Sequence, residues 1–361
     1  MRTWRRLGIQ FRGLEAPPEL VVFANRTLRR DPPLPLLDDR GAPAFLQVLD
    51  EQLTTYHASG DLLLPDLREA ESVTVLSDYG GEHKEAQYRT YSFLFTASDF
   101  VLPLLEGVRE IRERHRLEIE IAFKERRFGP LRRALPEILN LVDRTPGLLF
   151  TLAVDRKVTS IIDRNSREGA RRVAEAFAEL GVAEWDRDRY EKVARILHCC
   201  TYFLGLLGRD GHRVFWMTDH DAIAAGERQQ QALLALLAKM AGQYGPRRFD
   251  RFGFTPPFLA RADRPLAADV SELLAVPDLA AGAICELLGD YDAAGELRIS
   301  ERSESIARWL ARPTLMQKLV VRITPPRPGA PKDSIWSEIV QLRLAGPEPG
   351  AMIIPLIRSR P

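Results

Sequence analysis

The sequence has few cysteines, almost no net charge and no long apolar run. Its three cysteines are Cys199, Cys200 and Cys285, and two of them are neighbours in the chain, so a disulfide framework is not expected. So few cysteines in 361 residues are typical of a protein kept in the reducing cytoplasm. Lys and Arg number 51 against 50 Asp and Glu, so the overall field does not steer the protein toward nucleic acid or an anionic membrane. Any basic surface has to be local.

The sequence also lacks a segment that could serve as a membrane span or a secretory signal. The most apolar helical segment, residues 194–207, is shorter than the roughly 20 residues that a bilayer requires and contains Arg195 and His198. The first 13 residues carry four arginines but no continuous apolar core. We therefore expect no membrane span and a cytoplasmic location.

Several chemical signatures are absent as well. Gly80 and Gly81 lack the spacing and the following Lys-Ser/Thr of a phosphate-binding loop, and no dinucleotide fingerprint, zinc-ligand spacing or serine-hydrolase elbow occurs. No repeat of solenoid or propeller period is present. These absences exclude the commonest nucleotide-dependent and hydrolase classes.

What is present is an alternation of strand and helix patterns. A hydrophobic fraction of 45% with 28% charged residues is typical of a folded chain. Strands are predicted at 73–76, 88–96, 117–123, 148–154, 214–217, 315–324 and 335–344. Helices are predicted at 42–59, 98–114, 128–143, 168–180, 189–207, 225–244 and 277–288.

Three of these predictions carry most of the fold argument. The first strand is expected to run into a turn at 77–81 and to pair with 88–96 as a hairpin. The segment 117–123 alternates strictly between apolar and mainly charged positions, which is the clearest strand pattern in the chain. The cysteines of 189–207 fall on its apolar face and are expected in the core.

The resulting order, three strands followed by alternating helices and strands, resembles that of ribonuclease-H-like folds. We expect an α/β protein with a ribonuclease-H-like mixed β-sheet flanked by helices. The predicted organisation is an N-terminal extension at 1–70, a core at 71–300 and a C-terminal β-hairpin extension at 301–361, whose strands flank a Pro- and Gly-rich loop at 325–331.

Acidic residues occur where the predicted strands end and where a late helix begins. The candidates are Asp78, Glu120, Asp155, Asp219 and Asp278. Divalent cations such as Mg²⁺ prefer oxygen ligands, and two ions about 4 Å apart can activate water and stabilise a leaving oxygen. The acids can act in this way only if the sheet brings them together.

Two motifs resemble the family catalogued as domain of unknown function 3800. Residues 75–81, Val-Leu-Ser-Asp-Tyr-Gly-Gly, followed by the aromatic strand at 88–95, are similar to its opening Asp-Glu-Ser-Gly motif and second strand. Residues 274–284 are similar to its late motif, in which an aspartate, here Asp278, precedes apolar and small residues with a glycine four positions on, here Gly282. The two motifs frame roughly residues 72–288.

The resemblance implies a ribonuclease-H-like fold with Asp78 and Asp278 at metal-binding positions and Asp219 at a third. Two positions differ from the family pattern. Tyr79 stands where the family usually has Glu, and its acidic-x-Lys motif is Ala122-Phe123-Lys124 here.

Structural explanations stay open beside these functional ones. Asp78 before two glycines also suits a turn, and Asp278 in a first helical turn is favoured by the helix dipole. Glu118 and Glu120 are typical of the solvated face of a strand, and Asp155 and Asp219 of ordinary strand ends. His220, between two acids, is a candidate ligand or base, but an exposed loop histidine is the favoured interpretation.

Two basic segments are candidates for contact with nucleic acid. Lys124 and four arginines, at 126, 127, 132 and 133, crowd one predicted strand-to-helix junction, where they either grip phosphates or solvate a helix face. Residues 247–254 interleave cations with aromatics, as single-strand binders do.

From these observations we expect a metal-dependent phosphodiesterase acting on RNA or DNA with Mg²⁺ or Mn²⁺. Asp78, Asp219 and Asp278 are the expected primary ligands, Asp155 is a further metal-ligand candidate, Glu120 supplements them and Lys124 contacts phosphate. The alternatives are an inactive ribonuclease-H-like scaffold for a protein partner, favoured by the two missing acids, and a nucleic-acid binder that uses residues 247–254.

Overall fold

The structure is a computed structural model of the whole chain. It describes residues 34–37, 42–59, 62–158, 160–161, 171, 175, 177–182, 185–218, 223–241, 244, 251–254, 272–294, 303–326, 329 and 335–342. The predicted helix at 168–180 is described only at 171, 175 and 177–180. In the predicted loop at 247–254, residues 251–254 are described and form a strand, whereas 247–250 lie outside the described residues, as do Asp219 and His220.

Within the described residues, seven strands form one mixed sheet in the order β5-β4-β1-β2-β3-β6-β7. They are β1 (Ser72–Gly80), β2 (Tyr88–Ala97), β3 (Gly147–Asp155), β4 (Arg213–Thr218), β5 (Arg251–Phe254), β6 (Met316–Thr324) and β7 (Trp336–Val340). The first three strands are antiparallel neighbours, whereas β4 is parallel to β1 and β5 to β4. At the other edge β6 is parallel to β3 and antiparallel to β7.

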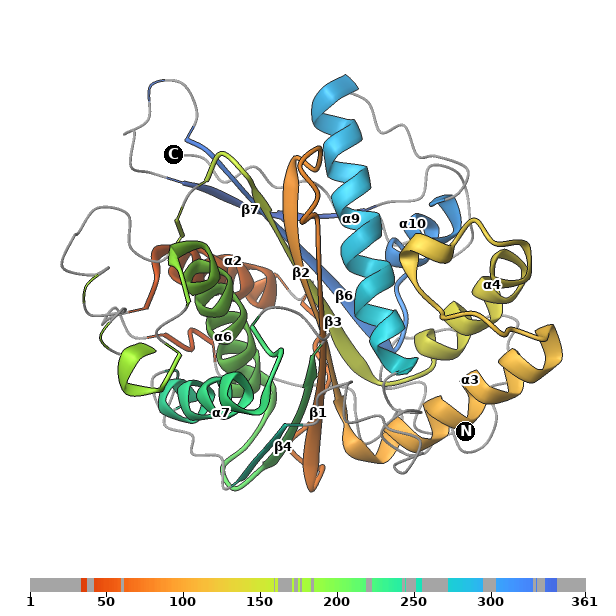
Figure 1. Ribbon diagram of the computed structural model, residues 1–361, viewed down its shortest axis with the longest axis horizontal. Coiled ribbons are helices and arrows are strands. Elements are labelled where there is room, and N and C mark those ends of the chain that lie inside the picture. The colour runs from red at the N-terminus through yellow and green to blue at the C-terminus, as the bar shows by residue number, and fades with distance from the viewer. Residues whose placement is uncertain are drawn as a thin grey trace.

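Helices cover both faces of this sheet (Figure 1). On one side lie α2 (Ala44–Ala58), α6 (Arg187–Leu207) and α7 (Glu227–Ala241), and on the other lie α3 (Val101–His115), α4 (Gly129–Asp143), α9 (Ala275–Ala294) and α10 (Glu304–Leu310). The expected α/β fold with a mixed sheet flanked by helices is therefore confirmed.

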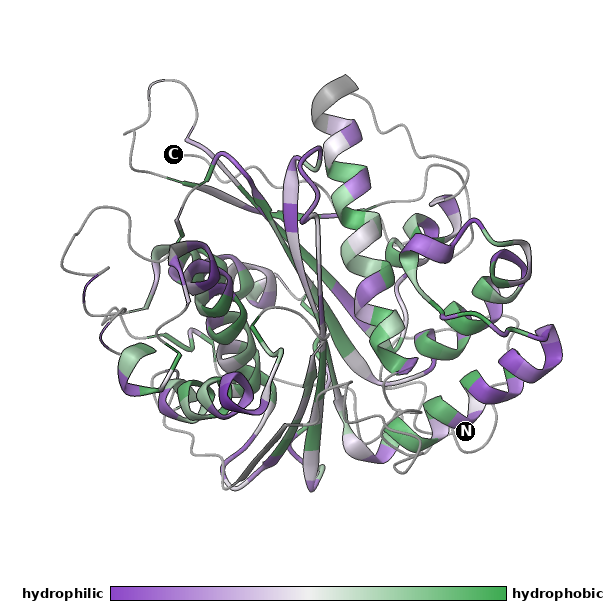
Figure 2. Ribbon diagram, in the orientation of Figure 1, coloured by the Kyte–Doolittle hydropathy of each residue, from purple (hydrophilic) through white to green (hydrophobic). Residues whose placement is uncertain are grey.

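Each face of the sheet has its own apolar core. Strand side chains alternate between the two faces, so Val75, Phe93 and Phe150 pack with α6, while Leu76 and Leu94 pack with α9. All nine residues of β3 are buried, as expected for a central strand covered on both faces. Figure 2 shows the apolar colouring concentrated on the sheet and along α9, with hydrophilic residues toward the outer end of α3.

The predicted strand at 117–123 is wrong. This segment is irregular and leads into a 3-10 helix at Phe123–Glu125. Its alternation does reflect burial, because Leu117 and Ile121 are buried while Glu118 and Glu120 are exposed. The segment does not join the sheet beside β2, because β2 already pairs with β1 on one side and with β3 on the other. The third strand of the sheet is therefore β3, and α3 and α4 precede it.

The β1–β2 hairpin is confirmed, but β1 is longer than predicted. It continues through the expected turn to Gly80, with Asp78 opposite Ser92 in the ladder. The turn begins at Gly81, where the backbone φ is 73° and an added Cβ would lie 1.9 Å from the Tyr88 carbonyl oxygen. Glycine is required at this position.

Two carboxylates, the buried Asp50 and the partly buried Asp143, connect the terminal segments to the core. Asp50 on α2 accepts a 2.7 Å hydrogen bond from the Tyr202 hydroxyl and also bonds from the backbone amides of Leu36 and Leu37. Asp143 accepts hydrogen bonds from the Trp309 indole at 2.7 Å and the Lys318 ammonium at 2.6 Å. The predicted C-terminal hairpin, β6 and β7, is formed and continues the main sheet.

Two further observations bear on the sequence predictions. Cys199 and Cys200 are buried on α6, as expected, and all three cysteines are free thiols. None of the helices described has both the length and the apolar character needed to cross a membrane.

His198 on α6 generates a prediction about stability. Its ring bonds to the Tyr244 hydroxyl, and burial lowers its pKa from 6.5 to about 4. Because the unfolded chain takes up this proton first as the pH falls, the free energy of unfolding should decline from pH 6.5 to about 4, by up to about 3 kcal/mol from this group. Urea denaturation of the wild type and His198→Phe at several pH values measures it. The wild type should lose more stability on acidification, and equal losses would contradict the prediction.

Candidate functional site

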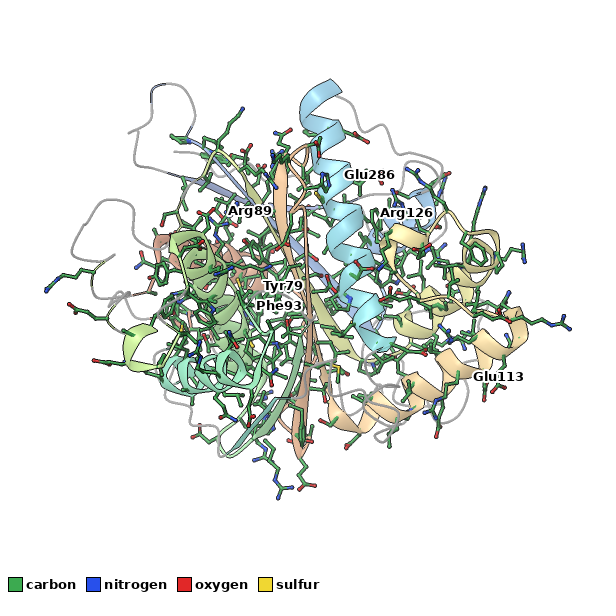
Figure 3. All side chains as sticks on the ribbon, in the orientation of Figure 1. Tyr79, Arg89, Phe93, Glu113, Arg126 and Glu286 are labelled. Carbon is green, nitrogen blue, oxygen red and sulfur yellow. The ribbon has the colours of Figure 1, made fainter. Side chains whose placement is uncertain are left out.

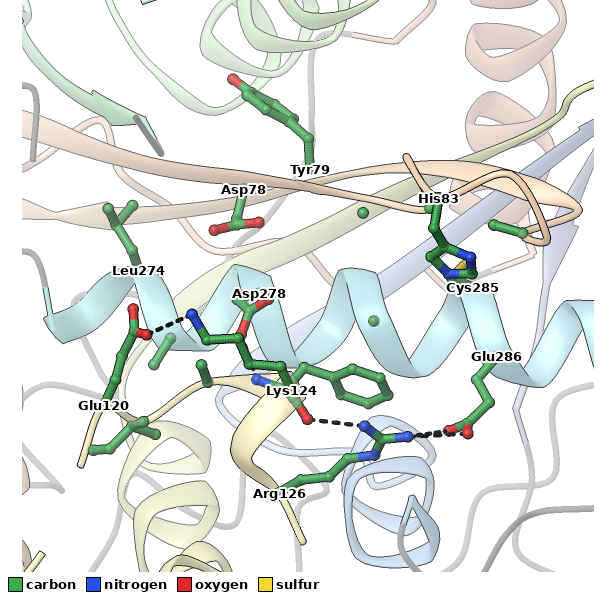
Figure 4. Close-up of a pocket in the computed structure, with 18 of the residues that line it drawn as sticks. Asp78, Tyr79, His83, Glu120, Lys124, Arg126, Leu274, Asp278, Cys285 and Glu286 are labelled. Atoms are coloured by element: carbon green, nitrogen blue, oxygen red, sulfur yellow. Dashed lines mark hydrogen bonds and ion pairs between the residues drawn. The ribbon is translucent and has the colours of Figure 1, made fainter. Parts of the chain in front are cut away.

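A cavity of about 1140 Å³ opens on the α9 side of the sheet, where β1 ends. Its walls come from the β1–β2 hairpin, the segment 118–126, and α9 with the 3-10 turn before it, and Arg112 of α3 completes them. Four of the predicted site residues line it together, namely Asp78, Glu120, Lys124 and Asp278. Figure 4 shows this grouping.

Asp78 and its neighbour Tyr79 point to opposite faces of the sheet, because side chains alternate along a strand. Asp78 is buried and faces α9, in line with Leu76 on the same face (Figure 4). Tyr79 points toward α6, where its hydroxyl bonds to Ser77 at 3.0 Å and accepts a 2.7 Å bond from Thr218 (Figure 3). An acid in place of Tyr79 would therefore point away from Asp78, so the missing family Glu removes no carboxylate from the α9 side.

Asp278 lies in the first turn of α9 and faces the same cavity. Its Oδ2 accepts a 2.5 Å hydrogen bond from the backbone N–H of Phe123. A carboxylate offers about four lone-pair positions, so this bond does not exhaust its capacity to accept or to ligate. Asp78 and Asp278 are 200 positions apart in sequence and reach one space because α9 packs across β1.

The segment 122–126 is docked along one stripe of α9. Asp278 holds the Phe123 amide, Gly282 lies under the Phe123 ring and Glu286 holds the Arg126 guanidinium at 3.0 Å. These α9 residues are spaced four apart and therefore share one helix face. Arg126 also lies 3.7 Å from the centroid of the Phe123 ring, which adds a cation–π contact.

Burial of Arg126 corrects part of the sequence interpretation. Arg126 is only 8% exposed and is committed to Glu286 and to the Phe123 carbonyl oxygen. It cannot grip a phosphate backbone at the surface together with its exposed neighbours Arg127 and Arg132. The basic cluster expected at this junction is thus divided between the interior and solvent.

Lys124 and Glu120 form an ion pair of 2.9 Å at the rim of the cavity. Both side chains are about two-thirds exposed, and the hydrogen bond that Lys124 donates to the Glu120 carboxylate raises the pKa of Lys124. An exposed pair of this kind contributes little to stability, typically about 0.2 to 1 kcal/mol. The pair can therefore be exchanged for another partner at low cost.

The charge of the cavity wall is strongly acidic, although the whole chain is nearly neutral. Three Lys or Arg residues line it, and each is paired with a wall carboxylate: Lys124 with Glu120, Arg126 with Glu286 and Arg112 with Glu272. Eight carboxylate side chains line it in all, and the five beyond these pairs are Asp78, Glu85, Glu118, Asp278 and Asp290. An acidic concave wall raises the local concentration of cations.

The remaining predicted acids are not in this group. Asp155 ends β3 and is buried, where it accepts bonds from the Lys157 amide at 2.8 Å and the Gln87 side chain at 3.4 Å, and it does not line the cavity. Asp219 lies outside the described residues. Among the residues that the structure describes, no group of three or more His, Cys, Asp or Glu is placed to hold a metal ion.

Sequence reasoning missed several residues that build the site. Arg156, directly after β3, donates to the carbonyl oxygens of Gly81, Glu82 and His83 and so shapes the hairpin turn at the cavity rim. Gly80 leaves room for Thr90, whose hydroxyl donates to a carbonyl of α9. Such long-range partners have no local sequence signal.

No protein-family model matches this chain, and searches of curated proteins and of solved structures find no significant match. The functional argument therefore depends on the geometry of the cavity itself.

The buried Arg126–Glu286 pair yields a test of the cavity wall. Glu286→Ala removes the carboxylate and leaves a buried guanidinium without its counter-ion, which should lower the free energy of unfolding by about 2 kcal/mol, since Glu286 is partly exposed. Adding Arg126→Met should recover part of this loss because the uncompensated charge is gone. Urea denaturation of the three proteins measures both steps, and a double variant weaker than Glu286→Ala would contradict the explanation.

Proposed function

We propose that this protein is a metal-dependent phosphodiesterase of ribonuclease-H-like architecture that acts on RNA or DNA. The observation that carries the proposal is that Asp78 and Asp278, predicted as ligands from separate motifs, line one acidic cavity. An acidic wall repels a polyanion unless divalent cations neutralise it, so the charge of the cavity favours a metal-assisted reaction over a simple basic phosphate site.

The arrangement of the sheet supports the finer fold assignment. Strands β1, β2 and β3 are antiparallel neighbours, with α3 and α4 inserted between β2 and β3, and β4 and β5 continue the sheet beyond β1, with β4 parallel to β1 and β5 parallel to β4. A late helix, α9, brings an aspartate to the end of β1. These are the features expected of a ribonuclease-H-like fold that gathers acids from the first strand and a late helix.

The residues present fit a divalent cation. Mg²⁺ is commonly held by one or two carboxylates, with water and substrate phosphates completing its coordination. Asp78 and Asp278 supply two carboxylates from rigid elements. We include Asp219 as a third ligand because it follows Thr218, which pairs with Ser77 in the parallel ladder.

Each side chain then has a distinct part in the reaction. Asp78 and Asp278 hold the cation, and Lys124 exchanges its partner Glu120 for a phosphate oxygen of the substrate. Glu120, released at the rim, supplements the acidic ligands. A bound Mg²⁺ or Mn²⁺ supplies Lewis-acid polarisation of the phosphodiester and activation of water.

The proposal predicts that the two cavity aspartates are required and that Asp155 is not. Asp78→Asn and Asp278→Asn preserve shape and hydrogen bonding but remove a ligand charge, so each should lower Mn²⁺ affinity and Mg²⁺-dependent cleavage by more than about 100-fold, the upper limit for loss of an outer-shell partner. Asp155→Asn is the matched control, a buried acid on the same sheet, and should leave both unchanged. Calorimetry with MnCl₂ and cleavage of labelled single-stranded RNA and DNA measure these effects.

The same experiment separates the alternatives. Cleavage that survives combined alanine replacement of Asp78 and Asp278 removes the assignment. Absence of metal binding in the wild type, together with a stable co-purifying protein, favours a non-catalytic scaffold instead.

A further inference from the structure

We infer that Phe123 and Gly282 are positioning residues for Asp278: the Phe123 ring packs on Gly282, and this contact keeps the Phe123 amide bonded to the Asp278 carboxylate. The inference rests on the proposed function insofar as Asp278 ligates a metal. It assigns a purpose to a glycine that the sequence shows only as part of a motif.

The need for glycine at position 282 follows from distance. A Cβ built there would lie 2.3 Å from two carbons of the Phe123 ring and 2.9 Å from the Phe123 Cβ, far inside van der Waals contact. Movement of the ring is restricted by the Arg126 guanidinium, which lies 3.7 Å from the ring centroid and is itself held by Glu286. We therefore expect a side chain at 282 to displace Phe123, including its backbone.

Displacement of Phe123 acts directly on Asp278. The 2.5 Å bond from the Phe123 amide fixes one oxygen of this carboxylate and so sets the direction of the other. Groups that hydrogen-bond to a metal-ligating carboxylate orient it, and their loss typically lowers metal affinity about 10- to 100-fold. The contact with Gly282 is thus coupled to the ligand one helical turn earlier on α9.

The segment also carries Lys124, so the same contact positions two groups of the cavity. Lys124 follows Phe123 in the 3-10 helix Phe123–Glu125 and reaches Glu120 at the rim. Loss of the docking contact is expected to disturb both the ligand and the phosphate-contacting lysine, whereas loss of Lys124 alone leaves Asp278 in place.

The test compares two glycines of α9. At Gly282 an alanine clashes with Phe123, whereas at Gly289 an added Cβ meets no atom within 4 Å. Gly282→Ala should weaken Mn²⁺ binding about 10- to 100-fold and speed hydrogen exchange of the Phe123 amide. Gly289→Ala should change neither, and it controls for the gain in helix propensity that both variants share.

A second test removes the Phe123 ring. Phe123→Ala keeps the backbone amide but makes room for a Cβ at 282, so Gly282→Ala should have almost no further effect on Mn²⁺ affinity in the Phe123→Ala background. This non-additivity is the signature of a direct contact, and a general loss of stability would not produce it. Thermal unfolding of each variant checks that it is folded.

The outcomes separate this inference from the proposed function. If the wild type binds no Mn²⁺, the metal assignment fails. Hydrogen exchange of the residue 123 amide still tests the positioning role in that case, because this exchange should be slow in the wild type and fast in Gly282→Ala. Equal Mn²⁺ affinity for Gly282→Ala and Gly289→Ala, or equal effects of Gly282→Ala with and without the Phe123 ring, overturns the inference.

Discussion

The close approach of α9 to the sheet is the contact on which the candidate site depends. The Thr90 hydroxyl donates to the Ala281 carbonyl oxygen at 3.0 Å, and Gly80 leaves the space that this approach requires. Small residues on α9 allow this short separation, and the geometry of the candidate site depends on it. Asp278 reaches the end of β1, the segment 122–126 docks on the outer stripe of the helix, and the cavity forms between them.

The electrostatics of the cavity result from how its charges are paired. Three Lys or Arg residues and eight carboxylates line the described wall, and each of the three cations forms an ion pair with a wall carboxylate, so the net charge of the wall is negative. This concentration of negative charge is invisible in the total composition, where acids and bases are almost equal. A locally acidic cavity in a nearly neutral protein is better suited to selecting small cations than to attracting nucleic acid from a distance.

Most strands and helices could be predicted from the sequence, whereas the long-range contacts that build the site could not. The strand at 88–96 and the helix at 189–207 were confirmed because both are rich in apolar and aromatic residues: nearly every residue of β2 is buried, and α6 is buried along most of its length. The error at 117–123 arose because alternate burial of Leu117 and Ile121 needs only an extended backbone, whereas a strand also needs a partner edge. Asp78 and Asp278 could be proposed from motifs, but the roles of Gly282 and Arg156 could not, because their partners lie many residues away.

The alternation at the end of β1 has a consequence for how the protein tolerates change. Asp78 and Tyr79 serve opposite faces, one in the acidic cavity and the other in a hydrogen-bonded chain with Ser77, Thr218 and the Trp216 indole. A slip of one residue would bury a carboxylate among the aromatic side chains beneath α6 and place a phenol where the acid belongs. Insertions or deletions within this strand should therefore disrupt both the core on one side and the cavity on the other.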